Sequence, residues 1–358
     1  MAESWRVVDT GLRTAAQNIA LNRALLEARR AGEIPGTLRF LRFTPSALIG
    51  CSQSPGQELN VESCKTDGIE IQRRLTGGDV MILDEGQLVW ELYLNRYDTG
   101  TTDLRTISRR LCHAAAAAVS ALGVNAAYRA PNDIEVDGRR ISDSAGVFDG
   151  DALLFQGTLC VDPDPAMPTR ASRLLGAAPG AASDRATSLK ALLGAKPDSA
   201  LIRRRLTEAF ESEFGVEFGD GDLTLSEHAR YQAALREIGH PDWVNLVSRP
   251  AAELPVLRAQ LRTAAGRLHA AVAYERPMHI IRQAWFAAEV APAQRRALTD
   301  LEAALRHLPA DRLAQRVERF FAGRQPDLLP LGPADIVEVL QRALGQLLNA
   351  GVNEKGGL

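Results

Sequence analysis

The sequence predicts an α+β fold: a mixed or antiparallel sheet flanked by helices, with a small α+β domain after it. Strand-like runs and helices follow one another without the regular βαβ alternation of a doubly wound sheet. The 358 residues, 46% of them hydrophobic, are enough for two domains. From about residue 255 the pattern changes character. We therefore expect a large domain over residues 1–250, a small accessory domain over 255–350 and a flexible tail over 351–358.

The elements of the first domain can be read in chain order. A helix is expected from Gly11 to Ala31, because apolar residues recur there at helical spacing and Gly32 ends the pattern. Asp137 and Gly138 predict a hairpin turn between two later strands. The other expected strands are 38–43, 47–50, 69–71, 80–83, 88–94, 127–128, 134–136, 140–142 and 152–159, and the other expected helices are 103–122, 200–219 and 226–239.

The accessory domain begins with two strand-like runs, 269–274 and 279–285, and continues with helical patterns. The expected helices cover residues 292–306, 310–322 and 333–348.

Composition narrows the class of function. The net charge of −2 and the pI near 6.3 argue against a nucleic-acid partner, which requires a basic surface. We expect no membrane segment, because no apolar run is long enough, and a cytoplasmic protein, because the start lacks a signal-peptide pattern. The four cysteines are widely spaced and the six histidines scattered, which argues against a metal held mainly by Cys or His.

The most informative stretch runs from Arg73 to Asp79 and reads Arg-Arg-Leu-Thr-Gly-Gly-Asp. Arg73 and Arg74 supply fork-shaped donors suited to carboxylate or phosphate. Gly77 and Gly78 let the backbone turn tightly and approach a ligand. The segment is therefore expected to be a strand, a glycine turn and a strand with an anion-binding rim. Taken alone, the same pattern is typical of a plain hairpin with a solvated basic pair.

Several further motifs occur in a fixed order before and after this stretch. They are Asn18-Ile19-Ala20, Ile49-Gly50, Asn60, the run Pro131-Asn132-Asp133 to Arg139-Arg140-Ile141-Ser142-Asp143-Ser144-Ala145, then Gly157-Thr158-Leu159 and Thr187-Ser188-Leu189-Lys190. Over roughly residues 10–250 this ordered set resembles the lipoate–protein ligase family, within the superfamily of biotin and lipoate ligases and octanoyltransferases. The resemblance implies that residues 1–250 form the catalytic domain, with a class II synthetase-like ligase core, and the part from 255 looks like the small accessory domain of the ligases.

The resemblance implies an ATP-dependent ligase. Lipoate and ATP would form lipoyl-adenylate, and the lipoyl group would pass to a lysine of a lipoyl-carrier domain, either like the glycine-cleavage H protein or like the E2 subunit of a 2-oxoacid dehydrogenase. Asp133 would face Mg²⁺ and act with Arg140 in catalysis. The residues implied to bind substrate or nucleotide are Arg73, Arg74, Thr76, Gly77, Gly78, Asp79, Asn132, Ser142, Ser144, Ala145, Gly157 and Thr158. Leu48, Leu75 and Leu83 would suit an acyl tunnel.

Four positions depart from the family pattern, and all belong to the implied site. Asp79 replaces a third glycine, Leu83 a histidine, Arg140 a lysine and Asp143 a glycine. Arginine keeps the positive charge but is bulkier and planar. The chain has only four lysines, so arginine at a lysine position does not by itself signal lost function.

Two alternatives to the ligase stay open. One is an octanoyl or lipoyl transferase of the same fold, for which Cys160 is a candidate nucleophile, although a lone cysteine in an apolar strand is more often a core residue. The other is a catalytically degenerate binding or regulatory protein, in which Arg140 forms a salt bridge with Asp143 or Asp79 and closes the pocket.

Overall fold

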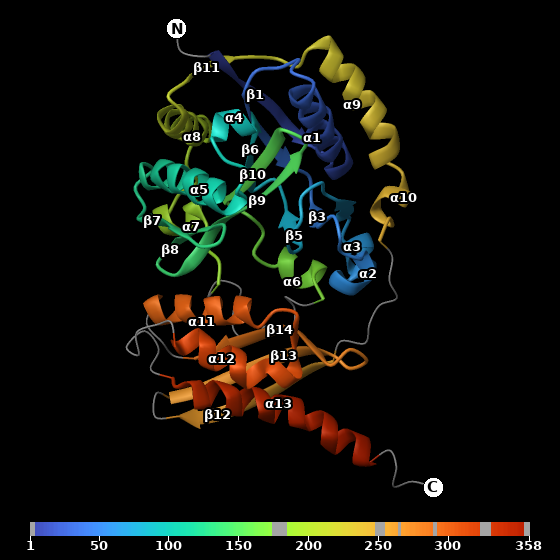
Figure 1. Cartoon of the computed structure of the whole chain (residues 1–358), viewed down its shortest axis with the longest axis vertical. Coiled ribbons are helices and arrows are strands. Elements are labelled where there is room, and N and C mark those ends of the chain that lie inside the picture. Colours follow the sequence, from blue (N-terminus) through green and yellow to red (C-terminus); the bar gives the residue numbers. More distant parts are fainter. Residues whose placement is uncertain are drawn as a thin grey trace. The chain divides into compact units, whose positions relative to one another are not determined.

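The computed structural model describes residues 4–173, 185–247, 255–263, 266–288, 292–322 and 331–353. The chain folds into two compact units (Figure 1). The first unit contains residues 1–172 and 185–249. The second unit contains residues 173–184 and residues 250–358. Helix α13 (Pro333–Asn353) runs into the stretch expected to be a tail, and residues 354–358 lie outside the described part.

The first unit is built on a mixed sheet, which confirms the predicted α+β class. Its strand order is β11-β1-β2-β6-β10-β9-β8-β7 among the described residues, and β1 runs parallel to both β2 and β11 while the other neighbours are antiparallel. The strands are β1 (Ser4–Arg13), β2 (Thr37–Phe43), β6 (Gln87–Asn95), β7 (Ala126–Arg129), β8 (Asp133–Val136), β9 (Arg139–Asp149), β10 (Ala152–Cys160) and β11 (Glu217–Asp220). A smaller sheet has the order β4-β3-β5, with β3 (Ser46–Ile49), β4 (Glu70–Arg73) and β5 (Met81–Leu83).

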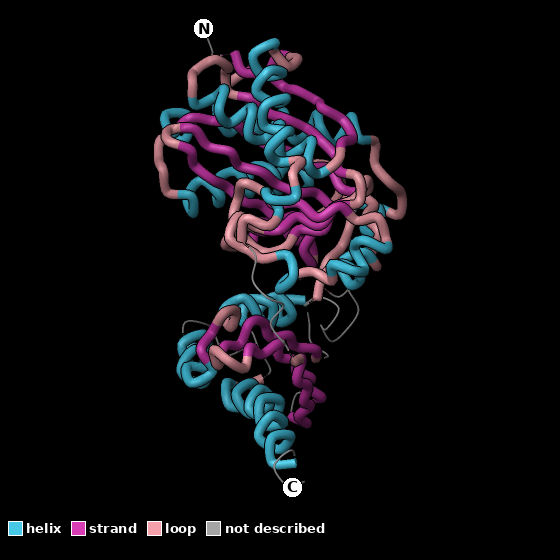
Figure 2. The backbone as a smooth tube through the Cα atoms, turned by 90° about the vertical axis from the view of Figure 1, so that its right-hand side faces the viewer, coloured by secondary structure: helices cyan, strands magenta, loops and turns pink. Residues whose placement is uncertain are grey.

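Helices cover both faces of the large sheet. On one face α1 packs with α9, and on the other face α5 and α8 enclose the largest apolar core (Figures 1 and 2). The helices are α1 (Ala15–Arg30), α2 (Pro55–Glu58), α3 (Val61–Thr66), α4 (Arg96–Thr99), α5 (Leu104–Ser120), α6 (Met167–Ala171), α7 (Leu189–Leu193), α8 (Ser199–Phe214), α9 (Leu225–Ile238) and α10 (Pro241–Val244).

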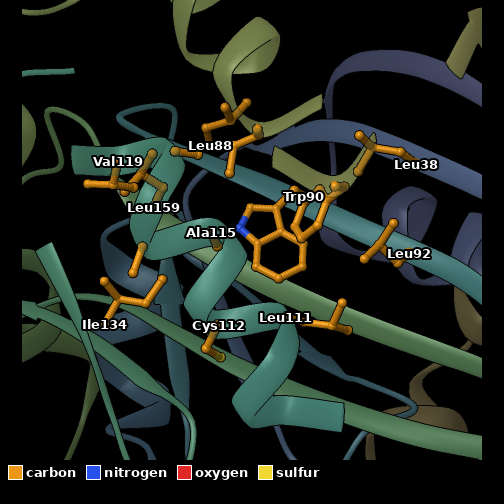
Figure 3. Packing of buried hydrophobic residues seen from close by; sticks show 14 of the residues in the cluster. Leu38, Leu88, Trp90, Leu92, Leu111, Cys112, Ala115, Val119, Ile134 and Leu159 are labelled. Atoms are coloured by element: carbon orange, nitrogen blue, oxygen red, sulfur yellow. The ribbon is translucent and has the colours of Figure 1, made fainter. Parts of the chain in front are cut away.

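Trp90 lies at the centre of the core under α5 and α8 (Figure 3). Its ring contacts Phe155 and Phe210, with ring centroids 6.0 and 4.9 Å away. Alternate residues of β6 and β10 point into this core because side chains alternate between the faces of a sheet. The intervening residues therefore face α1.

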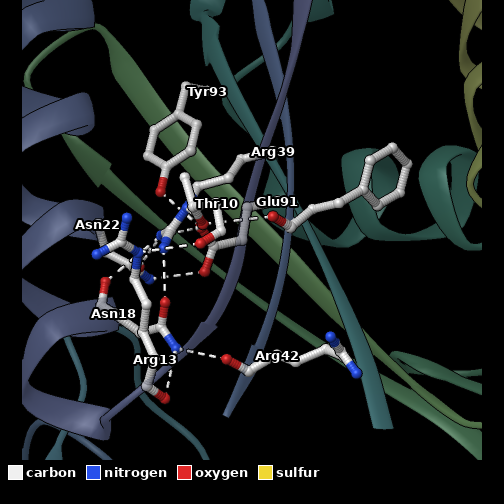
Figure 4. Close-up of polar contacts among 9 residues, drawn as sticks. Thr10, Arg13, Asn18, Asn22, Arg39, Arg42, Glu91 and Tyr93 are labelled. Carbon is white, nitrogen blue, oxygen red and sulfur yellow. Dashed lines mark hydrogen bonds and ion pairs between the residues drawn. The ribbon is translucent and has the colours of Figure 1, made fainter. Parts of the chain in front are cut away.

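A polar network is buried on the α1 face (Figure 4). The guanidinium of Arg39 donates to the carboxylate of Glu91 at 3.0 Å, to the side chain of Asn22 at 2.9 Å and to that of Asn18 at 2.7 Å. The hydroxyl of Tyr93 donates to Glu91 at 2.6 Å, and burial raises the pKa of Tyr93 well above its usual value. The network fixes α1 on the sheet through hydrogen-bonded charges rather than apolar contact alone.

Two helix predictions needed correction, and one turn prediction is confirmed. Residues 11–13 belong to β1, and α1 starts only after Thr14, whose hydroxyl accepts from the backbone N–H of Gln17 as an N-cap. The helix expected over 200–219 ends at Phe214, where Gly215 adopts a left-handed conformation, and β11 follows. The hairpin at Asp137 and Gly138 is confirmed, with φ of 51° and 74°.

The second unit is a four-stranded antiparallel sheet covered by helices, again counting described residues only. The sequence prediction missed its first strand. The elements are β12 (Val256–Thr263), β13 (Gly266–Glu275), β14 (Ile280–Ala287), β15 (Leu308–Pro309), α11 (Pro292–Ala304), the 3₁₀ turn η3 (Ala310–Arg312), α12 (Leu313–Ala322) and α13. Across the described part of the chain, we find no helix long and apolar enough to span a membrane.

Candidate functional site

The basic-glycine motif is not a hairpin, so the plain-hairpin interpretation is wrong. Strands β4 and β5 lie on opposite sides of β3 and do not pair with each other, and the loop from Arg74 to Val80 crosses between them. Gly78 has a φ of +97°, and a Cβ on Gly50 would lie 2.4 Å from the carbonyl oxygen of Gly78. Glycine at position 50 therefore allows the close approach of the two loops.

Arg73 points into the protein rather than towards a ligand. Its guanidinium donates to six backbone carbonyls at 2.7–3.3 Å, three in the loop of residues 50–53 and three between Trp243 and Val247. The indole N–H of Trp243 donates back to the carbonyl of Arg73 at 2.9 Å. Arg73 is 2% exposed, and its guanidinium joins these two segments of backbone.

Arg74 holds the glycine loop in the same way. It donates to the hydroxyl of Thr76 at 3.0 Å and to the carbonyls of Leu48, Gly77 and Asp79 at 2.6–3.0 Å. Burial lowers the pKa of Arg74 to about 10, against the opposing charges of Asp143 and Asp79. The guanidinium remains charged at neutral pH and contributes a fixed positive field beneath the loop.

Arg140 differs from both of these arginines. Among the described residues its guanidinium makes one ion pair, with Asp143 at 3.7 Å, and its side chain is 46% exposed. Partial burial lowers its pKa, but the carboxylates of Asp143, Asp133 and Asp79 raise it by more, so the net shift is upward. Arg140 therefore stays protonated and keeps donors that can take a ligand anion.

Thr158 on β10 contacts Asp143, the ion-pair partner of Arg140. The hydroxyl of Thr158 donates to the carboxylate of Asp143, and Asp133 lies opposite Asp143 in the register of β8 and β9. The structure therefore brings together Asp133, Arg140 and Thr158, three residues that the sequence predicted for the site. The carboxylates of Asp79 and Asp143 act electrostatically on both Arg74 and Arg140, which places the glycine loop beside this group.

The remaining predicted site residues have other positions. Ser144 points towards α5, where its hydroxyl lies 3.1 Å from the sulfur of Cys112 and donates to the carbonyl of Asn132 at 2.9 Å. Asn132 donates its side-chain amide to the carbonyl of Ser144, so these two residues brace the loop before β8. Ser142 is buried opposite Ile134, and Ala145 is half-buried opposite Gln156 on β10.

Gly157 faces away from Thr158. A Cβ at this position would lie 2.2 Å from the ring of Trp90, so glycine makes room for the indole in the core. The glycine of the Gly-Thr-Leu motif is thus explained by packing, and its threonine by the contact with Asp143.

Cys160 lies on the same face of β10 as Thr158, two residues further on. Burial and the charge of Asp143 raise the pKa of this thiol to about 12, although Arg140 opposes the shift. The thiol is therefore protonated at neutral pH.

Sequence reasoning missed Gln156. It is 4% exposed, yet its side-chain oxygen has no hydrogen-bond partner among the described residues. The signal available in the sequence was a polar amide inside the apolar run Ala152–Leu159. Of the three leucines expected to line a tunnel, Leu48 and Leu83 are buried in the core beneath α1, whereas Leu75 is half-buried.

A metal cage made by the protein alone is not present in the part of the chain that the structure describes, since no three His, Cys, Asp or Glu side chains converge there. Mg²⁺ in nucleotide enzymes is usually held by one or two carboxylates together with phosphate oxygens. Asp133, half-buried beside Arg129 at 3.5 Å, fits that mode of binding.

Residues 14–211 match the family described as the lipoyl protein ligase A/B catalytic domain, and the chain belongs to this family. It therefore falls among the enzymes of protein lipoylation.

Named relatives include both ligases and transferases. The octanoyltransferase LipM of Moorella thermoacetica is 28% identical over 272 residues, covering 68% of this chain and 98% of the relative. A crystal structure of lipoate-protein ligase A bound with ATP has a TM-score of 0.61 at 19% identity, covering 67% of this chain and 98% of the other. The bi-partite lipoate protein ligase of Thermoplasma acidophilum, studied with its E2 lipoyl domain, has a TM-score of 0.60 at 20% identity, covering 69% and 98%. At these identities the two structures support the fold alone.

Proposed function

We propose that this protein is a cytoplasmic lipoate–protein ligase that uses ATP to activate lipoate and transfers the lipoyl group to a lysine of a lipoyl-carrier domain. The observation that supports this proposal is the state of Arg140. Unlike the buried Arg73 and Arg74, it is 46% exposed and keeps most of its donors among the described contacts, and it lies beside Asp133, Asp143 and Thr158.

The chemistry requires a cation at this position. In the first step a lipoate oxygen forms a bond to the α-phosphorus of ATP while the bond to the leaving pyrophosphate breaks. Two anions must approach each other, and a fixed guanidinium reduces their repulsion. In the second step the carrier amine attacks the acyl carbonyl, loses a proton and displaces AMP. Arg140 can donate to the carboxylate and then to the carbonyl oxygen.

Mg²⁺ would supply the remaining charge neutralisation on the phosphates when bound. Asp133 is the side chain of this chain proposed to hold it, with phosphate oxygens completing the coordination. Arg74, buried beneath the glycine loop, would add positive potential near the phosphates without touching them. The second unit is proposed to act as an accessory domain.

An octanoyltransferase is the second candidate, favoured by the named relatives and by Cys160 on the same strand face as Thr158. This route forms a thioester on the cysteine sulfur from an acyl-carrier donor and needs no ATP. A pKa of about 12 weighs against it, because little of the Cys160 thiol is ionised near neutral pH.

The test measures both routes on the same protein. Purified chain is mixed with a lipoyl domain and either lipoate, ATP and Mg²⁺, or an octanoyl-carrier donor without ATP. Intact mass spectrometry reads the acyl group on the carrier, and a coupled assay reads pyrophosphate. We expect a lipoyl mass gain with pyrophosphate release.

Variants separate the roles. Arg140→Ala should lower kcat/KM for lipoate by about 100-fold or more, in line with loss of one preorganised donor, and Arg140→Lys should restore part of it. Arg204→Ala is the matched control, because Arg204 also makes an ion pair of 3.7 Å and is exposed on α8. ATP-independent octanoyl transfer lost in Cys160→Ser would favour the transferase, and carrier binding without any transfer would favour a non-catalytic protein.

A further inference from the structure

Gln156 is a buried amide that the protein itself leaves partly unpaired. Among the described residues its side-chain nitrogen has a single weak contact, with the sulfur of Met81 at 3.8 Å, and its oxygen accepts no hydrogen bond. Burying an unpaired polar group is costly, so natural proteins rarely keep one in a sheet without a reason.

The neighbours of Gln156 cannot satisfy it. Glu91 lies directly opposite on β6, but an ionised carboxylate only accepts hydrogen bonds and so offers no donor to the Gln156 oxygen; its own oxygens accept from Asn22, Arg39 and Tyr93. On the other side, β9 places the small residue Ala145 opposite Gln156.

Solvent reaches this face of the sheet beside Gln156. Ala145 is half-buried, the side chain of Asp143 is 24% exposed, and Leu75 at the start of the glycine loop is half-buried. An extended ligand with its acid group at Arg140 would pass over Ala145, and Gln156 lies opposite that residue.

Spacing along β10 indicates which part of the ligand that is. Gln156 and Thr158 share one face and are two residues apart, a separation of about 6.6 Å. An extended carbon chain covers this distance in about five bonds, for bond lengths of roughly 1.5 Å. If the carboxyl lies beside Thr158 and Arg140, the sixth carbon lies beside Gln156.

Resting on the proposed function, we propose that Gln156 selects the acyl chain: it favours an acid with a heteroatom at the sixth carbon, such as the sulfur of a dithiolane or its dithiol, over a plain saturated chain. The amide N–H can donate to a dithiolane sulfur, and the amide oxygen can accept from the S–H of a dithiol. Its contact with the Met81 sulfur already pairs this amide with a thioether. Octanoate brings only a methylene to the same place and leaves the amide unpaired.

The test is direct binding to the full-length chain without ATP or carrier. Isothermal titration calorimetry with lipoate, dihydrolipoate and octanoate gives three dissociation constants for the wild type and for Gln156→Met, an apolar side chain of similar length. We expect wild type to bind the better of the two sulfur acids about three- to tenfold more tightly than octanoate, the usual net range for one hydrogen bond. Gln156→Met should bring the ratio close to one and raise the melting temperature.

Two further variants keep the result interpretable. Gln156→His retains a donor and an acceptor and should keep the preference even if the methionine variant folds poorly. Gln283→Met removes a buried glutamine of β14 that is already hydrogen-bonded to the carbonyl of Ala284, and should leave the ratio unchanged.

The outcomes distinguish the two proposals. An unchanged ratio in Gln156→Met, or no preference in wild type, would overturn the selection by Gln156 while leaving the ligase intact. Failure of wild type to bind any of the three acids would overturn both.

Discussion

Replacing Arg73 by lysine tests whether this residue of the motif holds the protein together rather than binding a ligand. The guanidinium of Arg73 donates to six backbone carbonyls. A lysine ammonium has three donors on a single atom, so at least three of the carbonyls lose their partner. At about 0.5–1.5 kcal/mol net for each hydrogen bond, Arg73→Lys should cost about 2–4 kcal/mol of folding free energy.

Hydrogen exchange read by mass spectrometry, combined with urea unfolding, provides the assay. The two units need not unfold together, so the global transition alone is insufficient. In Arg73→Lys we expect faster exchange in residues 50–53 and 243–247, the two segments that the arginine joins, and an earlier unfolding of the first unit. Arg140→Lys is the matched control, and it should change stability by less than about 0.5 kcal/mol because Arg140 is exposed and makes one long ion pair.

One combination of unfolding and exchange results would contradict a structural role for Arg73. If Arg73→Lys unfolds at the wild-type urea concentration with unchanged exchange in both segments, the carbonyl contacts do not hold them. Loss of lipoate binding at unchanged stability would instead return Arg73 to the ligand-binding role that the sequence predicted.

Three shorter predictions follow from the same structure. Arg39→Met should cost about 3–5 kcal/mol because it leaves Glu91 buried without its cation, and the double variant Arg39→Met/Glu91→Leu should recover much of that in urea unfolding; equal losses in single and double variants would contradict this. Gly157→Ala should lower the melting temperature, because the added Cβ would sit 2.2 Å from Trp90 and overpacking costs about 1–3 kcal/mol; an unchanged value would mean that the indole moves freely. Alkylation of Cys160, followed by peptide mapping, should rise about tenfold per pH unit from pH 7 to 10 without a plateau, since its pKa is raised to about 12; a plateau near pH 8 would revive the thioester route.

Local pattern predicted most of the elements of the first unit. The apolar runs of β6 and β10 and the Asp137-Gly138 turn were readable because each depends on neighbours in the chain. The sequence prediction missed β1 and β11, because these strands depend on contacts with distant parts of the chain. They pair with each other across more than 200 residues, and that pairing, rather than local periodicity, makes them strands.

Residue types and their spacing were enough to predict the fold class, the order of motifs and thereby the family. The contacts of each motif residue became known only from the folded chain. The sequence does not distinguish Arg73, Arg74 and Arg140. In the structure the first two donate to backbone carbonyls, whereas most donors of Arg140 have no partner among the described contacts. Gly157 and Gln156 are adjacent, but strand alternation points one at Trp90 and leaves the amide of the other unpaired beside Ala145. Hydrogen-bond partners come from distant segments, so the availability of a side chain for chemistry is a property of the folded chain.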